Sequence, residues 1–181
     1  MTAQDHTKSF SIREATSGDM AEIAAIYQRY VLEGLASFEI EPPTTEDLDQ
    51  RRRNLQAGGY PYCVAELDGR VAGYAYAGPY RPRVAYQYSV EDSIYVSPDT
   101  GRLGIGSALL RRLITQCTEL GYRQMIAVIG DSANTGSVRL HEKAGFERVG
   151  FLPSIGFKLD QWVDSILMQR PLGEGDATMP A

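Results

Sequence analysis

Residues 93–121 constrain the fold of this chain more than any other segment of its 181 residues. A short apolar strand, Ile94–Val96, runs into a turn with three glycines, Gly101, Gly104 and Gly106, and a long amphipathic helix follows at once. Glycine lets the main chain of a turn approach a ligand closely, and the first N–H groups of a helix have no partner inside the helix. The segment therefore predicts an anion site, and the anion is most naturally a phosphate.

Size and composition indicate one globular domain. A chain with 43% hydrophobic and 23% charged residues can bury a sizeable core. The net charge of −5 argues against nucleic acid as a partner, because binding to a phosphate backbone needs a basic surface. No apolar run reaches membrane-spanning length, and the polar segment 1–8 lacks the apolar stretch of a signal peptide. Cys63 and Cys117 lack metal-ligand spacing, so we expect free, packed thiols in a cytoplasmic protein.

Apolar periodicity predicts a mixed α/β sandwich with a largely antiparallel sheet and helices on both faces. Asp68-Gly69, between two alternating runs, is a strong hairpin signal. We expect a single domain over 10–172, preceded by a flexible tail (1–9) and followed by a disordered tail (173–181). The predicted strands span 10–15, 62–67, 70–78, 86–96, 125–129, 147–157 and 162–170, and the predicted helices span 20–32, 45–56, 105–120 and 135–144.

The glycine turn does not match either of two common nucleotide-binding motifs. A P-loop needs Lys and then Ser or Thr after its last glycine, whereas Gly106 is followed by Ser107 and Ala108. A dinucleotide fingerprint needs a third glycine where this chain has Leu109. From these residues alone, a coenzyme site and a plain turn without a ligand both stay open.

The sequence R-L-G-I-G-S-A-L-L, after I-Y-V-S-P, resembles motif A of the GNAT superfamily of N-acetyltransferases, whose ligand is acetyl-coenzyme A (acetyl-CoA). Residues 130–146, with an asparagine before a short helix that ends at G-F, resemble the next block of that superfamily. The segments A-Y-A-G-P-Y, V-E-D-S-I-Y-V-S-P and S-V-R-L-H-E narrow the similarity to the phosphinothricin acetyltransferase family, over roughly 12–172.

This resemblance implies a fold and an activity. The fold is a GNAT-like sheet of six or seven strands, and the protein is a homodimer. The activity is direct, metal-free transfer of an acetyl group from acetyl-CoA to the α-amine of a small amino acid or an analogue. Phosphinothricin, methionine sulfoximine and methionine sulfone are such analogues.

Three residues are candidates for the chemistry. Glu91 matches the family's V-E segment, and apolar neighbours would raise the pKa of its carboxyl toward the range of a general base. The resemblance implies that the N–H of Val96 donates to the thioester oxygen. It also gives His141 a supporting role near substrate or thiolate, although a satisfied helix histidine is the alternative. Strand alternation places Asp92 on the opposite face from Glu91, so we expect no catalytic role for it.

The expected acetyl-CoA site relies mainly on main-chain N–H groups. The superfamily usually has Gln or Arg three residues before the central glycine, where this chain has Gly101, so cofactor binding should be weaker or differently arranged. Asn134 matches the superfamily asparagine that contacts the coenzyme, and it could also be a helix cap. The expected cofactor-binding residues are Ile94, Tyr95, Val96, Arg102, Leu103, Gly104, Ile105, Gly106, Ser107, Asn134 and Ser137.

An acidic amino-acid analogue needs cations for its oxygens, and arginine binds carboxylates bidentately. Loop arginines and the lysine of the last hairpin suit this, although each arginine could be a solvated loop charge. We expect the run Arg51–Arg53 to be an exposed helix face. No metal site is predicted, because the two histidines lack ligand spacing. The expected substrate-binding residues are Phe38, Arg81, Arg83, Tyr86 and Lys158.

Two other functions stay open at this level. An acyl-CoA-binding regulatory module without turnover is suggested by the unusual Gly101. Acetylation of peptide or protein amines would use the same fold, but the acidic charge balance and the phosphinothricin-like segments favour it less.

Overall fold

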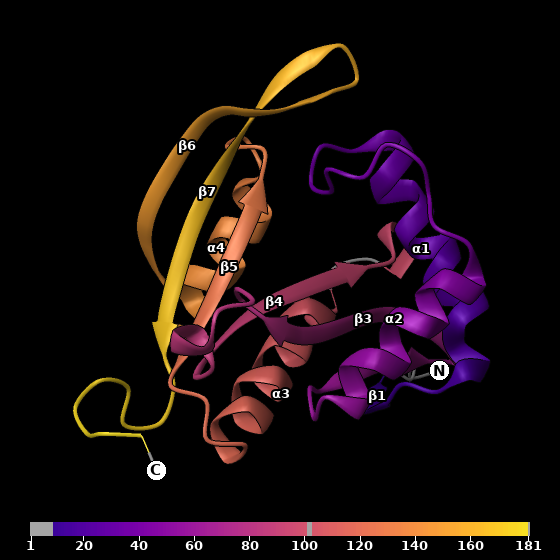
Figure 1. The fold of residues 1–181 in the computed structure, drawn as a ribbon. Helices are drawn as coiled ribbons and strands as arrows, with labels where there is room; N and C mark the ends of the chain where they lie inside the picture. The colour runs from indigo at the N-terminus through magenta and orange to yellow at the C-terminus, as the bar shows by residue number, and fades with distance from the viewer. Residues whose placement is uncertain (1–8, 101–102, 181) are drawn as a thin grey trace, which may run out of the picture.

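The computed structural model describes residues 9–100 and 103–180 (Figure 1). Within these ranges the helices are η1 (Ser17–Asp19), α1 (Met20–Glu33), α2 (Thr45–Ala57), η2 (Val84–Tyr86), η3 (Pro98–Thr100), α3 (Ile105–Glu119) and α4 (Thr135–Lys143). The strands are β1 (Phe10–Glu14), β2 (Tyr62–Leu67), β3 (Arg70–Pro79), β4 (Ser89–Val96), β5 (Gln124–Gly130), β6 (Glu147–Lys158) and β7 (Gln161–Pro171).

All of these strands belong to one sheet, in the order β1-β2-β3-β4-β5-β7-β6. Neighbouring strands run antiparallel except β4 and β5, which are parallel. The β2–β3 hairpin turns at Asp68 and Gly69, which have φ values of 53° and 76°. Both residues thus adopt the left-handed conformation that a tight two-residue hairpin requires. The predicted mixed, largely antiparallel fold is confirmed.

Alternation along the strands separates two cores on opposite faces of the sheet. On one face, α1 and α2 cover a layer of tyrosines in which Tyr62 stacks on Tyr76 at 5.0 Å and Tyr74 on Tyr95 at 5.1 Å. On the other face, α3 and α4 cover aliphatic side chains of β4 and β5. Cys63 and Cys117 are buried in this second core as free thiols, as their sequence context predicts.

The parallel strands β4 and β5 pair over a short distance and then separate. Their register joins residues 89–92 to residues 124–127, and beyond these four pairs no bridge connects them. Figure 1 shows β4 and β5 diverging from this shared end. The sheet therefore has a wedge-shaped gap between Ser93–Val96 and Val128–Gly130, and the candidate site lies there.

Two local predictions are wrong. The strand predicted over 86–96 begins only at Ser89, because Tyr86 and Gln87 donate their N–H groups to Arg83 and Val84 in the 3-10 turn η2. The second residue of the predicted exposed arginine run is buried.

Arg52 is only 7% exposed, because its guanidinium turns toward η1 and donates to Asp49 and to the hydroxyl of Ser17. Residues 173–180 form turns, and Arg123 contacts Glu174 and Thr178. The domain boundaries and the disorder expected of the tails stay predictions, and most of the first tail lies outside the described residues.

Candidate active site

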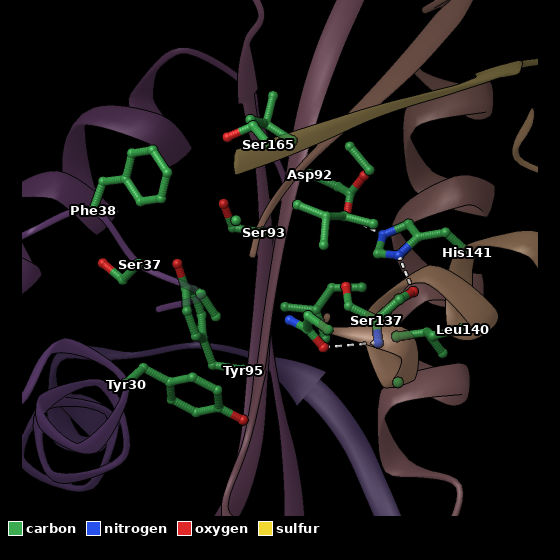
Figure 2. Close-up of a pocket in the computed structure, with 18 of the residues that line it drawn as sticks. Tyr30, Ser37, Phe38, Asp92, Ser93, Tyr95, Ser137, Leu140, His141 and Ser165 are labelled. Carbon is green, nitrogen blue, oxygen red and sulfur yellow. Dashed lines mark hydrogen bonds and ion pairs between the residues drawn. The ribbon is translucent and has the colours of Figure 1, made fainter. Parts of the chain in front are cut away.

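A cavity of about 730 Å³ occupies the gap between β4 and β5. Its walls are Glu91–Val96 of β4, Ala127–Gly130 of β5, the loop Ala36–Glu39 after α1, and the first turns of α4. Because it passes through the sheet, the cavity is reached from both faces. Figure 2 shows this arrangement, with Phe38 and Tyr30 on one side of the strands and His141 on the other.

Strand β4 presents alternate side chains to the two ends of this cavity. Tyr95 packs with the tyrosine layer, whereas Ile94 and Val96 pack with the core beneath α3. By the same two-residue period, Glu91 faces the α1–α2 side and Asp92 faces the α3–α4 side. The predicted base thus lies at one end of the cavity, and a second carboxylate lies at the other.

Glu91 is half-buried in the cavity wall. Burial raises the pKa of its carboxyl, the charge of Asp92 raises it further, and Arg81 opposes the shift. A carboxyl in this setting takes up a proton more readily than a solvated one, which suits proton transfer near neutral pH. The structure brings Glu91 to the cavity as the sequence predicts, and its catalytic role stays a prediction.

The N–H of Val96 has a partner that the sequence did not reveal. Ser97 donates its N–H to Ala72 of β3, so the N–H of Val96 points away from β3, toward the gap. There it donates to the Tyr30 hydroxyl at 3.3 Å, and that hydroxyl donates to the Val96 carbonyl at 2.7 Å. The donor expected to be free is thus held by Tyr30 of α1.

The N-terminus of α3 lies on the α3–α4 side of the gap. Gly104 is its N-cap with φ 78°, a left-handed conformation that favours glycine, and among the described residues no side chain caps the helix. The first N–H groups, at Ile105, Gly106 and Ser107, therefore remain available to an anion. Leu103 is at the surface, while Gly101 and Arg102 lie outside the described residues.

Helix α4 begins at Asn134, whose side chain accepts a hydrogen bond from the Ser137 N–H at 3.1 Å. The cap interpretation of Asn134 is confirmed, and both residues also line the cavity. The Ser137 carbonyl in turn accepts from His141 Nδ1 at 2.8 Å, which fixes the imidazole on the cavity side of α4. One turn of main chain thus connects the cap to the histidine.

His141 and Asp92 form a buried pair (Figure 2). His141 Nε2 lies 3.0 Å from Asp92 Oδ2, and the two side chains are 4% and 2% exposed. Burial by itself would lower the pKa of His141, but the hydrogen bond and charge of Asp92 outweigh burial and hold it above its ordinary value. Strand alternation thus predicts the face of Asp92 correctly, but not its partner on α4. That Asp92 has no catalytic role stays a prediction.

The residues expected to bind substrate are not all brought together. Phe38 lies in the cavity wall, whereas Arg81, Arg83 and Tyr86 lie exposed in the connection between β3 and β4, outside the wall. Arg81 stacks over the ring of Tyr80 and acts electrostatically on Glu91.

Lys158 is buried, and its ammonium donates to the main-chain carbonyls of Ser37 and Tyr30. It thus holds the loop that lines the cavity and does not itself face the cavity. Among the described residues, no group of three or more His, Cys, Asp or Glu side chains could hold a metal ion. None of the helices within the described part of the chain has the length and apolarity to cross a membrane.

The fold and the gap define an acyltransferase-type domain, and comparison with known proteins gives its family. The Acetyltransferase (GNAT) family profile matches residues 23–146, and the chain belongs to this family of acetyltransferases. Phosphinothricin N-acetyltransferase of Alcaligenes faecalis is 46% identical over 170 residues, which are 94% of this chain and 86% of the relative. L-amino acid N-acyltransferase MnaT of Escherichia coli is 38% identical over 167 residues, 91% and 95% of the two chains.

A solved structure agrees with these relatives. The phosphinothricin acetyltransferase (Pat) of Sinorhizobium meliloti, in complex with AcCoA, superimposes with a TM-score of 0.92 at 47% identity, over 95% of this chain and 93% of that one. The predicted family and the assignment as an acetyltransferase enzyme are confirmed. A regulatory module without turnover and a peptide acetyltransferase are not favoured by these likenesses.

Proposed function

We propose that this enzyme transfers the acetyl group of acetyl-CoA to the α-amine of a small amino acid or an analogue of the phosphinothricin and methionine sulfoximine type. Relatives named for these substrates cover nearly the whole chain. The single observation that carries the mechanism is the cavity through the sheet, with Glu91 in one part of its wall. The start of α3 lies beside it, where Gly106 approaches the cavity-lining residues Val96 and Leu140. Two substrates that enter from opposite faces would meet in the gap, so transfer is direct.

The diphosphate of acetyl-CoA fits the start of α3. Its charge matches the helix N-terminus, and the left-handed Gly104 exposes successive N–H groups from Ile105 to Ser107. Ile94, Tyr95 and Val96 border the route from there into the gap, with Asn134 and Ser137 on the other side. We assign these residues to the coenzyme, with Leu103 at the edge of its site; Arg102, outside the described residues, stays an expected contact from the sequence.

Glu91 is the proposed general base. An ammonium has no lone pair, so the carboxylate, directly or through water, removes a proton before the nitrogen attacks the thioester carbonyl. The N–H of Val96 is the proposed donor to the resulting oxyanion. The Tyr30 hydroxyl, which accepts from this N–H in the structure, either moves away or shares the hydrogen bond with the oxyanion. No cysteine acts as an acyl carrier in this proposal, because burial raises the pKa of both thiols to about 12.

The substrate enters on the Glu91 side, between Phe38 and the β3–β4 connection. Arg81 acts electrostatically on the Glu91 carboxyl. Arg83 and Tyr86 lie further along the same connection between β3 and β4. We propose that this connection closes on the acidic end of the substrate. Lys158 acts through the loop that it holds, by its bond to the carbonyl of Ser37 in that loop.

We further propose a homodimer through the β6–β7 hairpin, in a cytoplasmic protein whose two buried thiols stay reduced. The hairpin extends past the end of β5 (Figure 1), and a second copy would cover its apolar side chains and its open edge strand. The exposed apolar residues of the hairpin are Val149, Phe151, Leu152, Ile155, Phe157, Leu159 and Trp162.

Release of coenzyme A tests the activity. Purified protein is mixed with acetyl-CoA and a thiol reagent, and phosphinothricin, methionine sulfone, ordinary amino acids and a peptide with a free N-terminus are supplied in turn. We expect release with the free amino-acid analogues above that with the peptide. Release with the peptide alone would contradict the proposed substrate class, and no release with any amine would contradict turnover.

A further inference from the structure

The Asp92–His141 pair holds a defined number of protons. A carbonyl oxygen can only accept, so the bond from His141 to Ser137 places a proton on Nδ1. The contact of 3.0 Å between Nε2 and Asp92 Oδ2 needs a second proton, because a nitrogen lone pair would repel a carboxylate oxygen. One proton of the pair is therefore fixed by the main chain, and the other is shared across the contact.

Asp92 and His141 both line the cavity, and their side chains are almost fully screened from solvent. Asp92 Oδ1 is buried and has no hydrogen-bond partner among the described residues. The Phe146 ring packs against the imidazole in a T-shaped arrangement, with the ring centroids 5.0 Å apart. The titratable groups that act on Asp92 are the Glu91 carboxyl of β4 and the Cys117 thiol of α3. Neither is a cation, and His141 is the cationic partner of Asp92 that the described part of the chain provides.

The position of the pair matches the requirement for an acid. Acetyl transfer needs a base beside the amine and a proton for the departing thiolate, which must come from elsewhere than the base. Acetyl-CoA approaches from the α3–α4 side, where the helix N-termini lie, so its sulfur leaves on that side. Glu91 lies at the opposite end of the same cavity, and Asp92 and His141 line the end where sulfur departs.

We propose that His141 donates the proton that the departing thiolate takes up, and that Asp92 is a positioning residue that keeps His141 protonated for this step. The inference rests on the proposed transfer from acetyl-CoA. When the C–S bond of the tetrahedral intermediate breaks, its electron pair goes to sulfur and the shared proton moves from His141 Nε2 to that sulfur. His141 is left neutral, with its proton on Nδ1, opposite an ionised Asp92. The substrate ammonium loses two protons in becoming an amide; one reloads the pair through solvent and the other leaves to solvent by way of Glu91.

Asp92→Asn tests this role, because the amide keeps the shape but removes the charge that retains the proton. The chain has two histidines, so His6→Gln leaves His141 as the one imidazole to follow by NMR. In that background we expect Asp92→Asn to lower the pKa of His141 by more than about one unit. We expect kcat at pH 8 to fall by about 10²-fold or more, the usual range for loss of an acid catalyst.

The pH profile separates this role from a structural one. In the unsubstituted enzyme, kcat should fall at alkaline pH as the pair loses its shared proton, and Asp92→Asn should move this fall to lower pH. The fall at acid pH, which reports Glu91, should also move to lower pH, because the charge of Asp92 raises the pKa of Glu91. The move of the alkaline fall is therefore the diagnostic one, and calorimetry should show unchanged affinity for coenzyme A. Asp176→Asn, at the surface, is the matched control.

Two results would overturn the proposal. One is a kcat within about threefold of the starting enzyme with an unmoved alkaline limb; the other is a shift confined to the acid limb, which would assign the effect to Glu91. If Asp92→Asn does not fold, as judged by circular dichroism, His141→Gln carries the same test, since glutamine can bond Asp92 but has no proton to give. Where both fold, the double variant should lose no more than the worse single variant, because the two residues act as one unit.

Discussion

The ammonium of Lys158 lies 2.5 Å from the main-chain carbonyl oxygen of Ser37, a residue 121 positions earlier in the chain. The contact joins the end of β6 to the loop that lines the cavity beside Glu91. A buried charge is retained only where it is well bonded, and here the carbonyl of Ser37 in the loop and the carbonyl of Tyr30 in α1 both accept from it. The hairpin therefore holds the substrate side of the cavity in place.

Lys158→Met should loosen this loop. The substitution keeps an aliphatic chain but leaves two carbonyls without their donor, so we expect a loss of about 1–3 kcal/mol in the free energy of unfolding. KM for the amino-acid substrate should rise more than kcat falls, because positioning is lost and the reacting groups remain. Denaturant titration and initial rates measure the two effects, with the exposed Lys143→Met as the stability control. Equal stability of the two variants would contradict the role of this contact.

Gly156→Ala should displace Phe38 from the cavity wall. A Cβ at this position would meet the Phe38 ring at 2.6 Å, so the ring must move. We expect the fold to survive, since the clash is with the end of a side chain, and we expect KM for the amino acid to rise. Phe38→Ala alone gives the effect of an absent ring, and adding Gly156→Ala to it should change KM no further. A further rise in the double variant would mean that the glycine acts on something other than this ring.

Glu91→Gln should abolish most turnover while it raises stability at neutral pH. Loss of a general base costs about 10²–10⁴-fold in rate. Because the pKa of Glu91 is raised in the folded protein, its ionised form destabilises the fold, and a neutral amide removes that cost above the ordinary pKa of 4.5. The melting temperature of the variant should therefore exceed that of the parent at pH 7, and the two should be equal at pH 4. Glu46→Gln, on the surface of α2, should change neither rate nor stability.

Arg13→Met should weaken the fold in a pH-dependent way. The Arg13 guanidinium donates to both oxygens of Asp19 and holds the pKa of that carboxyl at about 2. A lowered pKa means that the stabilisation is complete above the ordinary value of 3.8 and is lost as pH falls toward 2. At pH 7 we expect a loss of about 1–2 kcal/mol, discounted for the partly exposed arginine. A stability difference as large at pH 2 as at pH 7 would contradict this origin, because Asp19 is by then about half protonated. Arg70→Met, on an exposed strand end, is the control.

Trp162→Glu should disrupt the proposed homodimer. Trp162 is 67% exposed and packs edge-on against Phe157, and both belong to the apolar surface of the hairpin. A charge there cannot be buried against a second copy without a large cost in free energy. Sedimentation should give a dimer for the parent and a monomer for the variant. A monomeric parent would refute the assembly without affecting the assignment of the catalytic groups.

Local sequence was sufficient to predict most elements of this fold. The left-handed Gly104 at the start of α3 and the hairpin at Asp68-Gly69 follow from residue types whose backbone conformations are restricted. The face occupied by Glu91 follows from strand alternation. Each of these features depends on neighbours within a few residues.

The missed features depend on contacts between distant segments. Alternation gives the face of Asp92 but not the helix that covers it, and the pairing with His141 spans 49 residues. The Tyr30 hydroxyl at the N–H of Val96 and the tie from Lys158 to the cavity loop are of the same kind. In each case the chain position of a polar group was identified, and its partner was set by how helices and strands pack.

Only four bridged residue pairs join β4 to β5 in the described sheet. A molecule lodged in the wedge would bridge main chain on both sides, much as an added strand does, so acetyl-CoA should couple the two strands mechanically as well as serve as acetyl donor. Amide hydrogen exchange should then slow at residues 93–96 and 128–130 on binding, and thermal unfolding should become more cooperative.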